Sequence, residues 1–171
     1  LNHSFSAIST GGFSTRYNSM ASFQSLPVEL VTIAIMLAGG INFLMYYKLI
    51  TRQWRGPLYD TELRVFLGIF VVATLLITAN LCGAQLHAPG ADVPPVTYEV
   101  GTALRHAAFE VATMMTDCGF VLVNYDHWPL FSQLILLLIT MTGGCVGSTA
   151  GGFKILRLVV LFHILRNWLE R

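Results

Sequence analysis

Charged residues are scarce in this sequence. Asp, Glu, Lys and Arg make up 11% of its 171 residues, whereas 54% of the residues are hydrophobic. Average soluble chains carry about 25% charged residues, so the composition excludes an ordinary water-soluble domain and predicts an integral membrane protein. The formal net charge is only +1. There is no acidic or basic excess of the kind that attracts nucleic acid, and we expect no nucleic-acid partner.

Cysteine is also rare, and its three copies stand alone. Cys82, Cys118 and Cys145 form no Cys-x-x-Cys pair, which excludes the usual zinc spacings and a disulfide framework. The first residues lack the basic stretch that begins a signal peptide. The chain also lacks an initiator methionine and opens inside a patterned segment, so we expect a fragment of a longer protein.

Two uninterrupted apolar stretches are long enough to cross a bilayer. Residues 28–47 and 65–84 each supply about 20 residues, the length that a hydrocarbon core of about 30 Å requires. We expect Asn42, in the later half of the first stretch, to bond to a neighbouring helix. Residues 1–14 and 103–115 are too short to span, and they predict half-helices that enter the membrane and turn back.

A third apolar stretch, residues 130–165, is interrupted by glycine. Residues 141–154 read Met-Thr-Gly-Gly-Cys-Val-Gly-Ser-Thr-Ala-Gly-Gly-Phe-Lys, and the helix before them reaches only about 20 Å. Irregular backbone at membrane depth is tolerated only where it is buried in protein or lines a water-filled path. We interpret the interruption as a loop in an ion pathway. The alternative is a glycine-rich packing kink between transmembrane helices.

The distribution of basic residues orients the chain. Residues 48–64 contain four Lys or Arg residues, and residues 85–129 contain one, Arg105. Because cytoplasmic loops carry the excess of Lys and Arg, we expect 48–64 in the cytoplasm and 85–129 outside.

The same order of elements occurs twice: half-helix, Gly-Phe turn, polar bend, long helix. The turns are Thr10-Gly11-Gly12-Phe13 and Asp117-Cys118-Gly119-Phe120. A half-helix that stops inside the membrane directs its negative C-terminal end at whatever follows, which attracts a cation. An extended turn then offers backbone carbonyls in place of the hydration shell, and the first turn has the Thr-x-Gly-aromatic spacing of potassium-channel filters. The pattern predicts two walls of a cation filter.

Several motifs resemble the TrkH/KtrB potassium-transporter superfamily. Residues 3–15, His-Ser-Phe-Ser-Ala-Ile-Ser-Thr-Gly-Gly-Phe-Ser-Thr, are similar to its second pore segment, and residues 39–43, Gly-Gly-Ile-Asn-Phe, to the helix after it. Residues 128–131 and 143–154 are similar to the third repeat, where the family keeps an intramembrane gating loop. The resemblance covers essentially the whole chain and is greatest to TrkH proteins.

The resemblance implies an all-α integral membrane fold. Its unit is a span, a re-entrant pore half-helix, a filter turn and a second span, and the last helix here is broken by the glycine-rich loop. Residues 1–50 would end the second repeat, 51–64 would form a cytoplasmic linker, and 65–171 would form the third repeat. The family further implies four repeats in one chain, a homodimer, a cytosolic TrkA-like nucleotide-binding regulatory subunit, and multi-pass insertion in a bacterial inner membrane.

The motifs also assign the site. Potassium is expected at the backbone of Thr10, Gly11, Gly12, Cys118 and Gly119, with Asp117 opening the second turn. The expected gate residues are Gly143, Gly144, Gly147, Ser148, Thr149, Gly151, Gly152 and Lys154. Asp117 departs from the family, which usually has Thr or another small residue there. It either contacts the ion or supports the filter from behind, through Arg105 or a helix end. Lys154 is either part of the gate or reaches toward the cytoplasmic surface.

These features predict the pore-forming subunit of a Trk-type potassium uptake system, with no bound cofactor and no enzymatic activity. The alternatives are a sodium- or proton-coupled cation symporter of the same fold and a non-conducting scaffold fragment. The near absence of carboxylates within the spans favours channel-like permeation. Ser148 and His163 lack a nucleophile elbow, and residues 147–154 lack the spacing and the preceding strand of a phosphate loop.

Overall fold

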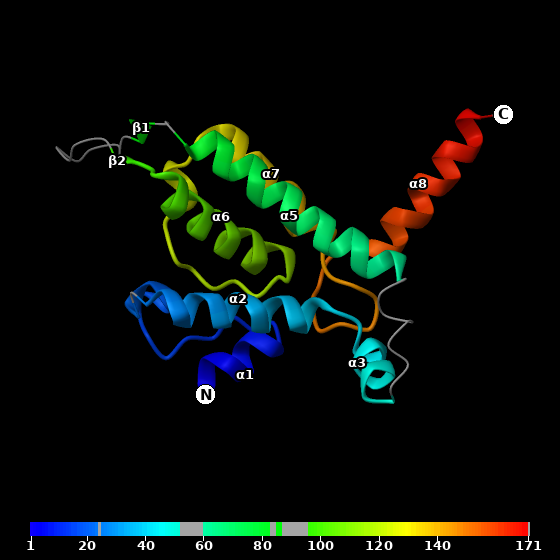
Figure 1. The fold of residues 1–171 in the computed structure, drawn as a ribbon, viewed down its shortest axis with the longest axis horizontal. Coiled ribbons are helices and arrows are strands. Elements are labelled where there is room, and N and C mark those ends of the chain that lie inside the picture. The colour runs from blue at the N-terminus through cyan, green and yellow to red at the C-terminus, as the bar shows by residue number, and fades with distance from the viewer. Residues whose placement is uncertain (24, 52–59, 83–84, 87–95, 171) are drawn as a thin grey trace.

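The computed structural model describes residues 1–23, 25–51, 60–82, 85–86 and 96–170, which are mostly helical (Figure 1). The α-helices are α1 (Asn2–Ile8), α2 (Leu26–Gly40), α3 (Phe43–Ile50), α5 (Thr61–Leu81), α6 (Val100–Met115), α7 (Leu130–Thr142) and α8 (Ile155–Leu169). Two single turns of 3-10 helix are η1 (Ser19–Ser22) and η2 (Tyr125–His127). The antiparallel strands β1 (Gln85–Leu86) and β2 (Val96–Thr97) form a minimal ribbon that the sequence did not predict.

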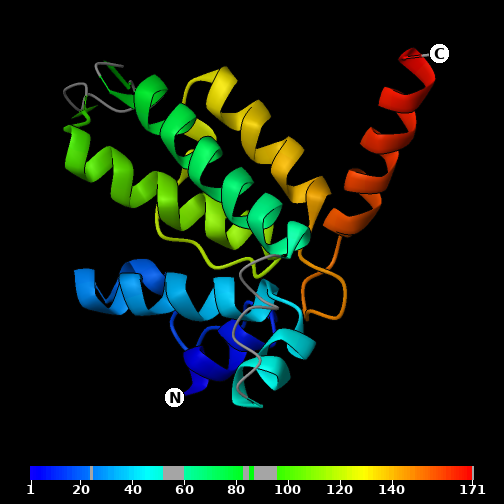
Figure 2. The same ribbon diagram turned by 45° about the vertical axis from the view of Figure 1, so that its right-hand side comes forward.

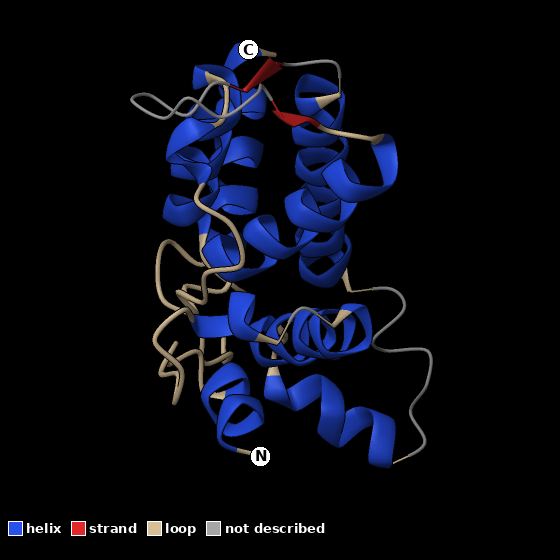
Figure 3. Cartoon of the chain, turned by 90° about the vertical axis from the view of Figure 1, so that its left-hand side faces the viewer, coloured by secondary structure: helices blue, strands red, loops and turns tan. Residues whose placement is uncertain are grey.

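The helices form two packed groups. Helices α5, α6 and α7 pack against one another, α1 packs against α2, and the contact between α2 and α6 joins the two groups. Small residues on α6, among them Ala103 and Ala107, are fully buried and allow close approach of its neighbours. Helix α8 projects away from both groups (Figure 2), and the two termini lie at opposite ends of the molecule (Figure 3).

Helix α5 is the element best suited by length to cross a bilayer. Within the described residues it alone is a single helix of sufficient length and hydropathy, and the bent pair α2 and α3 would give a second span. The helix was expected at 65–84 but begins at Thr61, because Asp60 Oδ1 accepts the N–H groups of Glu62 (2.9 Å) and Leu63 (3.4 Å). The linker predicted at 51–64 therefore ends earlier, and residues 52–59 of it lie outside the described residues.

The prediction of one uninterrupted helix over residues 28–47 is wrong. The helix ends at Gly40, and α3 restarts at Phe43 with a bend of 96°. Asn42 was expected to bond between helices, but its side-chain oxygen instead accepts the N–H of Leu44 (2.8 Å) and caps α3. The carbonyls of Gly39 and Gly40 accept N–H groups from residues 149 and 145 rather than from the next helical turn. The break in the helix therefore leaves these two carbonyls free to bind amides from a segment far along the sequence.

Other helices lie in the order that the sequence predicted. Helix α6 and the short α1 are half-helices that end at Gly-Phe turns, and α7 and α8 are separated by the glycine-rich segment at 143–154, which we call the glycine loop. In Figure 1 the C-terminal ends of α1 and α6 and the orange glycine loop gather around the second half of α2. This region contains every residue that the sequence assigned to the site.

Candidate functional site

Helix α1 ends in a specific backbone motif. The N–H of Thr10 donates to the carbonyl of Ala7 (3.2 Å), and the N–H of Gly11 donates to the carbonyl of Ser6 (2.9 Å). Thr10 has φ +52°. These two bonds around a left-handed residue define a Schellman motif, which satisfies carbonyls that the end of a helix leaves without partners.

Helix α6 ends in the same motif at the corresponding residues. The N–H of Asp117 donates to Met114 (3.3 Å), the N–H of Cys118 donates to Thr113 (2.9 Å), and Asp117 has φ +53°. A gapless alignment therefore places Asp117 on Thr10 in conformation as well as in sequence. The internal repeat is confirmed at the level of single backbone angles.

The left-handed conformation carries strain at Thr10. Thr10 and Asp117 both carry side chains at a position where φ is positive, and Thr10 is β-branched. Positive φ is a true outlier for a β-branched residue, and such strain collects at functional sites. Gly12 (φ +66°) and Gly119 (φ +78°) follow in the same conformation, for which glycine has no penalty.

The two Gly-Phe turns lie side by side. A Cβ atom on Gly12 would lie only 2.0 Å from the carbonyl oxygen of Cys118, which means that the two backbones are in direct contact. Cys118 as a whole is 3% exposed, and its thiol lies 3.9 Å from Ser6 O. Gly11 and Gly119 are exposed. The two turns thus present backbone from adjacent walls.

The aromatic residues of the two turns differ. Phe120 is 1% exposed and packs in the core, whereas Phe13 is 81% exposed in this segment. Within this segment, the two equivalent phenylalanines therefore have different surroundings.

The glycine loop folds back on itself. A Cβ on Gly143 would lie 2.2 Å from the carbonyl oxygen of Gly151, and a Cβ on Gly152 would lie 2.9 Å from Cα of Gly143. Gly143 and Gly152 also have positive φ. The two ends of the glycine loop are therefore in backbone contact, and a residue larger than glycine would prevent this contact.

Backbone hydrogen bonds fix the loop to the break between α2 and α3. The N–H of Cys145 donates to Gly40 O (2.9 Å), and the N–H of Thr149 donates to Gly39 O (3.2 Å). In the opposite direction, the N–H of Phe43 donates to Gly147 O (3.1 Å). The loop therefore takes the place of the missing helical turn, which explains why α2 stops where it does.

A buried carboxylate on α5 also holds the loop. Glu62 is 8% exposed, and its Oε1 accepts the N–H of Val146 at 2.6 Å. A charge-assisted bond to a backbone amide is stronger than a neutral one. The sequence analysis did not single out Glu62 as a functional residue.

The loop is bonded directly to the first Gly-Phe turn. The hydroxyl of Thr10 donates to the carbonyl of Thr149 (2.9 Å). The hydroxyl of Thr149 lies within hydrogen-bond distance of the carbonyls of Ile8 (2.9 Å) and Gly39 (3.0 Å). Thr149 is thus the point at which the loop, the end of α1 and the end of α2 meet.

Asp117 faces the loop as well. A Cβ on Gly151 would lie 2.8 Å from Asp117 Oδ2. The suggestion that Asp117 bonds to Arg105 is wrong, because the Arg105 guanidinium pairs with Glu29. The amine of Lys154 donates to Ala150 O within the loop. The structure thus brings together the six turn residues and eight loop residues that the sequence had assigned.

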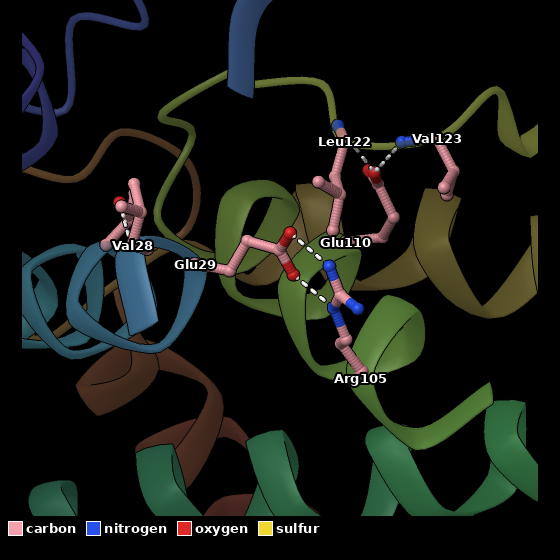
Figure 4. Close-up of polar contacts among 7 residues, drawn as sticks. Val28, Glu29, Arg105, Glu110, Leu122 and Val123 are labelled. Atoms are coloured by element: carbon pink, nitrogen blue, oxygen red, sulfur yellow. Dashed lines mark hydrogen bonds and ion pairs between the residues drawn. The ribbon is translucent and has the colours of Figure 1, made fainter. Parts of the chain in front are cut away.

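The Glu29–Arg105 pair was not found from the sequence. Arg105 on α6 reaches Glu29 on α2 through two guanidinium nitrogens, as Figure 4 shows. Glu29 is 1% exposed and the Arg105 side chain is 33% exposed. The pair therefore crosses the junction between the two helical groups.

Removing either partner of this pair should destabilise the protein unequally. Arg105→Met leaves a buried carboxylate without a partner and should lower the free energy of unfolding by about 3 kcal/mol. Glu29→Leu should cost less, because the half-exposed guanidinium can reach solvent. Thermal unfolding of the full-length protein in detergent measures both, and the double variant should recover most of the loss. Equal effects of the two single variants would contradict this assignment.

Comparison with known proteins identifies the family. The family model described as "TrkH: Cation transport protein" matches residues 1–171. The chain belongs to the TrkH family. The crystal structure of the potassium transporter TrkH from Vibrio parahaemolyticus matches with a TM-score of 0.84 at 32% identity, over 99% of this chain and 35% of that chain. The family resemblance and the all-α integral membrane fold predicted from the sequence are thereby confirmed.

Curated relatives give the same result. The Trk system potassium uptake protein TrkH of Salmonella typhimurium is 32% identical over 100% of this chain and 34% of its own length. The Trk system potassium uptake protein TrkG of Escherichia coli K12 is 35% identical over 94% of this chain and 31% of its own length. The chain thus spans about a third of these TrkH-family relatives.

Proposed function

We propose that this segment supplies two walls of the filter and the gate of a potassium uptake protein, the pore-forming subunit of a Trk-type system. The relatives named as potassium uptake proteins support this substrate. The observation that carries the proposal is the pair of Gly-Phe turns with matching φ signs, in backbone contact at the ends of two half-helices.

In this proposal the turns replace the hydration shell of potassium. Carbonyl oxygens of Thr10, Gly11 and Gly12 on one wall and of Cys118 and Gly119 on the next coordinate the dehydrated ion. The C-terminal ends of α1 and α6 direct their negative dipole ends to the same region and favour a cation there. Asp117 adds a carboxylate on the side facing the loop and acts as support rather than as a direct ligand.

The glycine loop is the proposed gate. Its attachment to Thr10 and Gly39 supports a location next to the first turn, on the path of the ion. Glycine-rich backbone can rearrange at little steric cost, and the gate residues lie at or next to the points where the loop is fastened. Lys154 belongs to this gate through its bond to Ala150 O.

The proposed assembly follows the family. The full-length chain would supply two further repeats, form a homodimer in a bacterial inner membrane, and bind a cytosolic TrkA-like nucleotide-binding subunit. No resident cofactor and no enzymatic activity are required, because the ion is the cargo and the coordinating groups are backbone carbonyls.

The full-length protein should restore growth of potassium-uptake-deficient bacteria at low external potassium, and the segment 1–171 alone should not. Two filter walls cannot enclose an ion. Potassium uptake into energised cells, measured with rubidium-86 as tracer, checks the full-length protein and the segment at matched membrane abundance. Failure of the full-length protein to transport, or flux through the segment alone, would overturn the proposal. Uptake that requires external sodium or a proton gradient would identify the symporter alternative.

A further inference from the structure

Glu110 is a buried carboxylate with a defined pair of partners. It lies on α6 and is 0% exposed. Its Oε1 accepts the N–H groups of Leu122 (3.2 Å) and Val123 (3.3 Å), which belong to the chain that leaves the second Gly-Phe turn. Figure 4 shows this carboxylate directed to that chain, while Arg105 on the same helix is directed to α2. Because this segment encloses Glu110 completely, its contacts do not depend on the other repeats.

The first repeat unit has a counterpart at the same place. The alignment that places Thr10 on Asp117 places His3 on Glu110. His3 Nε2 lies 2.9 Å from the hydroxyl oxygen of Ser14, the residue directly after Phe13. The imidazole therefore also joins a half-helix to the chain that leaves its Gly-Phe turn.

The two connections end at equivalent backbone N–H groups in the two repeats. Ser14 Oγ accepts the N–H of Arg16 (3.0 Å), and Arg16 aligns with Val123, whose N–H binds Glu110. One repeat thus uses a direct carboxylate and the other uses a histidine with a serine between. The chemistry differs, but the amide that is held is equivalent in both units.

These connections span the turns that would coordinate the ion. Each turn is fixed at its start by the Schellman bonds of the half-helix, and at its end by the His3 or Glu110 contact. The His3 ring also lies 6.1 Å, centroid to centroid, from the ring of Phe120 in the other turn. A turn held at both ends keeps its carbonyl spacing when an ion enters, and carbonyl number and spacing are what discriminate potassium from sodium.

We propose that Glu110 and His3 are positioning residues for the two Gly-Phe turns, and that the Glu110 carboxylate sets ion selectivity through the second turn without touching the ion. This inference rests on the filter proposed above. It assigns a selectivity role to side chains outside the filter sequence. The Glu110 oxygen acts by holding two amides, so any acceptor of the same shape should serve.

The test compares Glu110→Ala with Glu110→Gln in the full-length protein. The glutamine carbonyl can accept the same two N–H groups, whereas alanine leaves both without a partner. We expect Glu110→Ala to lower the ratio of rubidium to sodium uptake by about tenfold, because two hydrogen bonds are lost. Glu110→Gln should recover most of that ratio. A merely structural role would reduce the amount of transporter in the membrane but leave the ratio unchanged.

A second variant decides the case in which Glu110→Ala does not reach the membrane. Ser14→Ala removes the acceptor for the Arg16 N–H at a partly exposed site, and it should lower the same ratio through the first turn. The inference is overturned if the variant that reaches the membrane, Glu110→Ala or Ser14→Ala, keeps the wild-type ratio of rubidium to sodium uptake. A wild-type protein that fails to transport would overturn the proposed function instead, so the two failures are distinguishable.

Discussion

Replacing Gly12 with alanine should lower potassium uptake by the full-length protein at least about 100-fold. The new Cβ would lie 2.0 Å from the carbonyl oxygen and 3.1 Å from the carbonyl carbon of Cys118, and φ at this position is +66°. Backbone cannot rotate away as a side chain can, so the two turns must separate by about 1 Å or more. Displacements of this size at a site that depends on geometry cost about 100-fold in rate.

Gly11→Ala is the matched control for Gly12→Ala. A Cβ at Gly11 would meet the Phe13 ring at 3.3 Å, which is a movable side chain, and φ there is not in the left-handed region. The second turn also carries a side chain, Cys118, at the equivalent position. Rubidium uptake at matched membrane abundance should fall by less than about tenfold. Similar losses for both variants would show that contact between the turns does not matter.

Releasing the glycine loop from its contacts should raise ion flux, whereas Gly12→Ala should lower it. The double variant Glu62→Ala/Thr149→Val removes the carboxylate bond to the Val146 amide and the one bond that the Thr149 hydroxyl donates to Ile8 O or Gly39 O. A charge-assisted bond and a neutral bond together contribute about 3 kcal/mol. Each 1.4 kcal/mol is tenfold in an equilibrium. If the loop closes the path, the open population should rise by about 100-fold, until it saturates.

Ion flux through reconstituted vesicles, without the regulatory subunit, measures this effect. Thr140→Val serves as the control, because among the described residues the Thr140 hydroxyl bonds only to Leu136 O within α7 (2.9 Å). It should leave flux at the wild-type level. A double variant with wild-type flux would show that the loop, although next to the first turn, does not control the path.

The sequence predicted the local elements of this site well because each one has a local cause. Half-helices too short to span, turns that require glycine, and a glycine-rich interruption of an apolar helix are all visible within a dozen residues. Position 117 illustrates the limit of this reasoning. The repeat placed Asp117 correctly in the turn, but nothing in the sequence could show that its carboxylate faces Gly151 rather than Arg105.

Contacts between distant segments account for what the sequence did not predict. The end of α2 at Gly40 depends on amides from the glycine loop, and without them residues 28–47 read as one helix. Glu29, Glu62 and Glu110 are each buried by partners more than one element away or across a turn. A carboxylate in an apolar stretch signals that a partner exists, but its identity is set by the packing of the helices.

The most direct test of the central claim is the position of the ion. Crystals of the full-length protein grown or soaked with thallium or rubidium should give anomalous difference density at about 3 Å from the carbonyl oxygens of Thr10–Gly12 and Cys118–Gly119. Density at this point would place both Gly-Phe turns on the ion path. Density confined to other positions, with these carbonyls facing only protein atoms, would contradict the account.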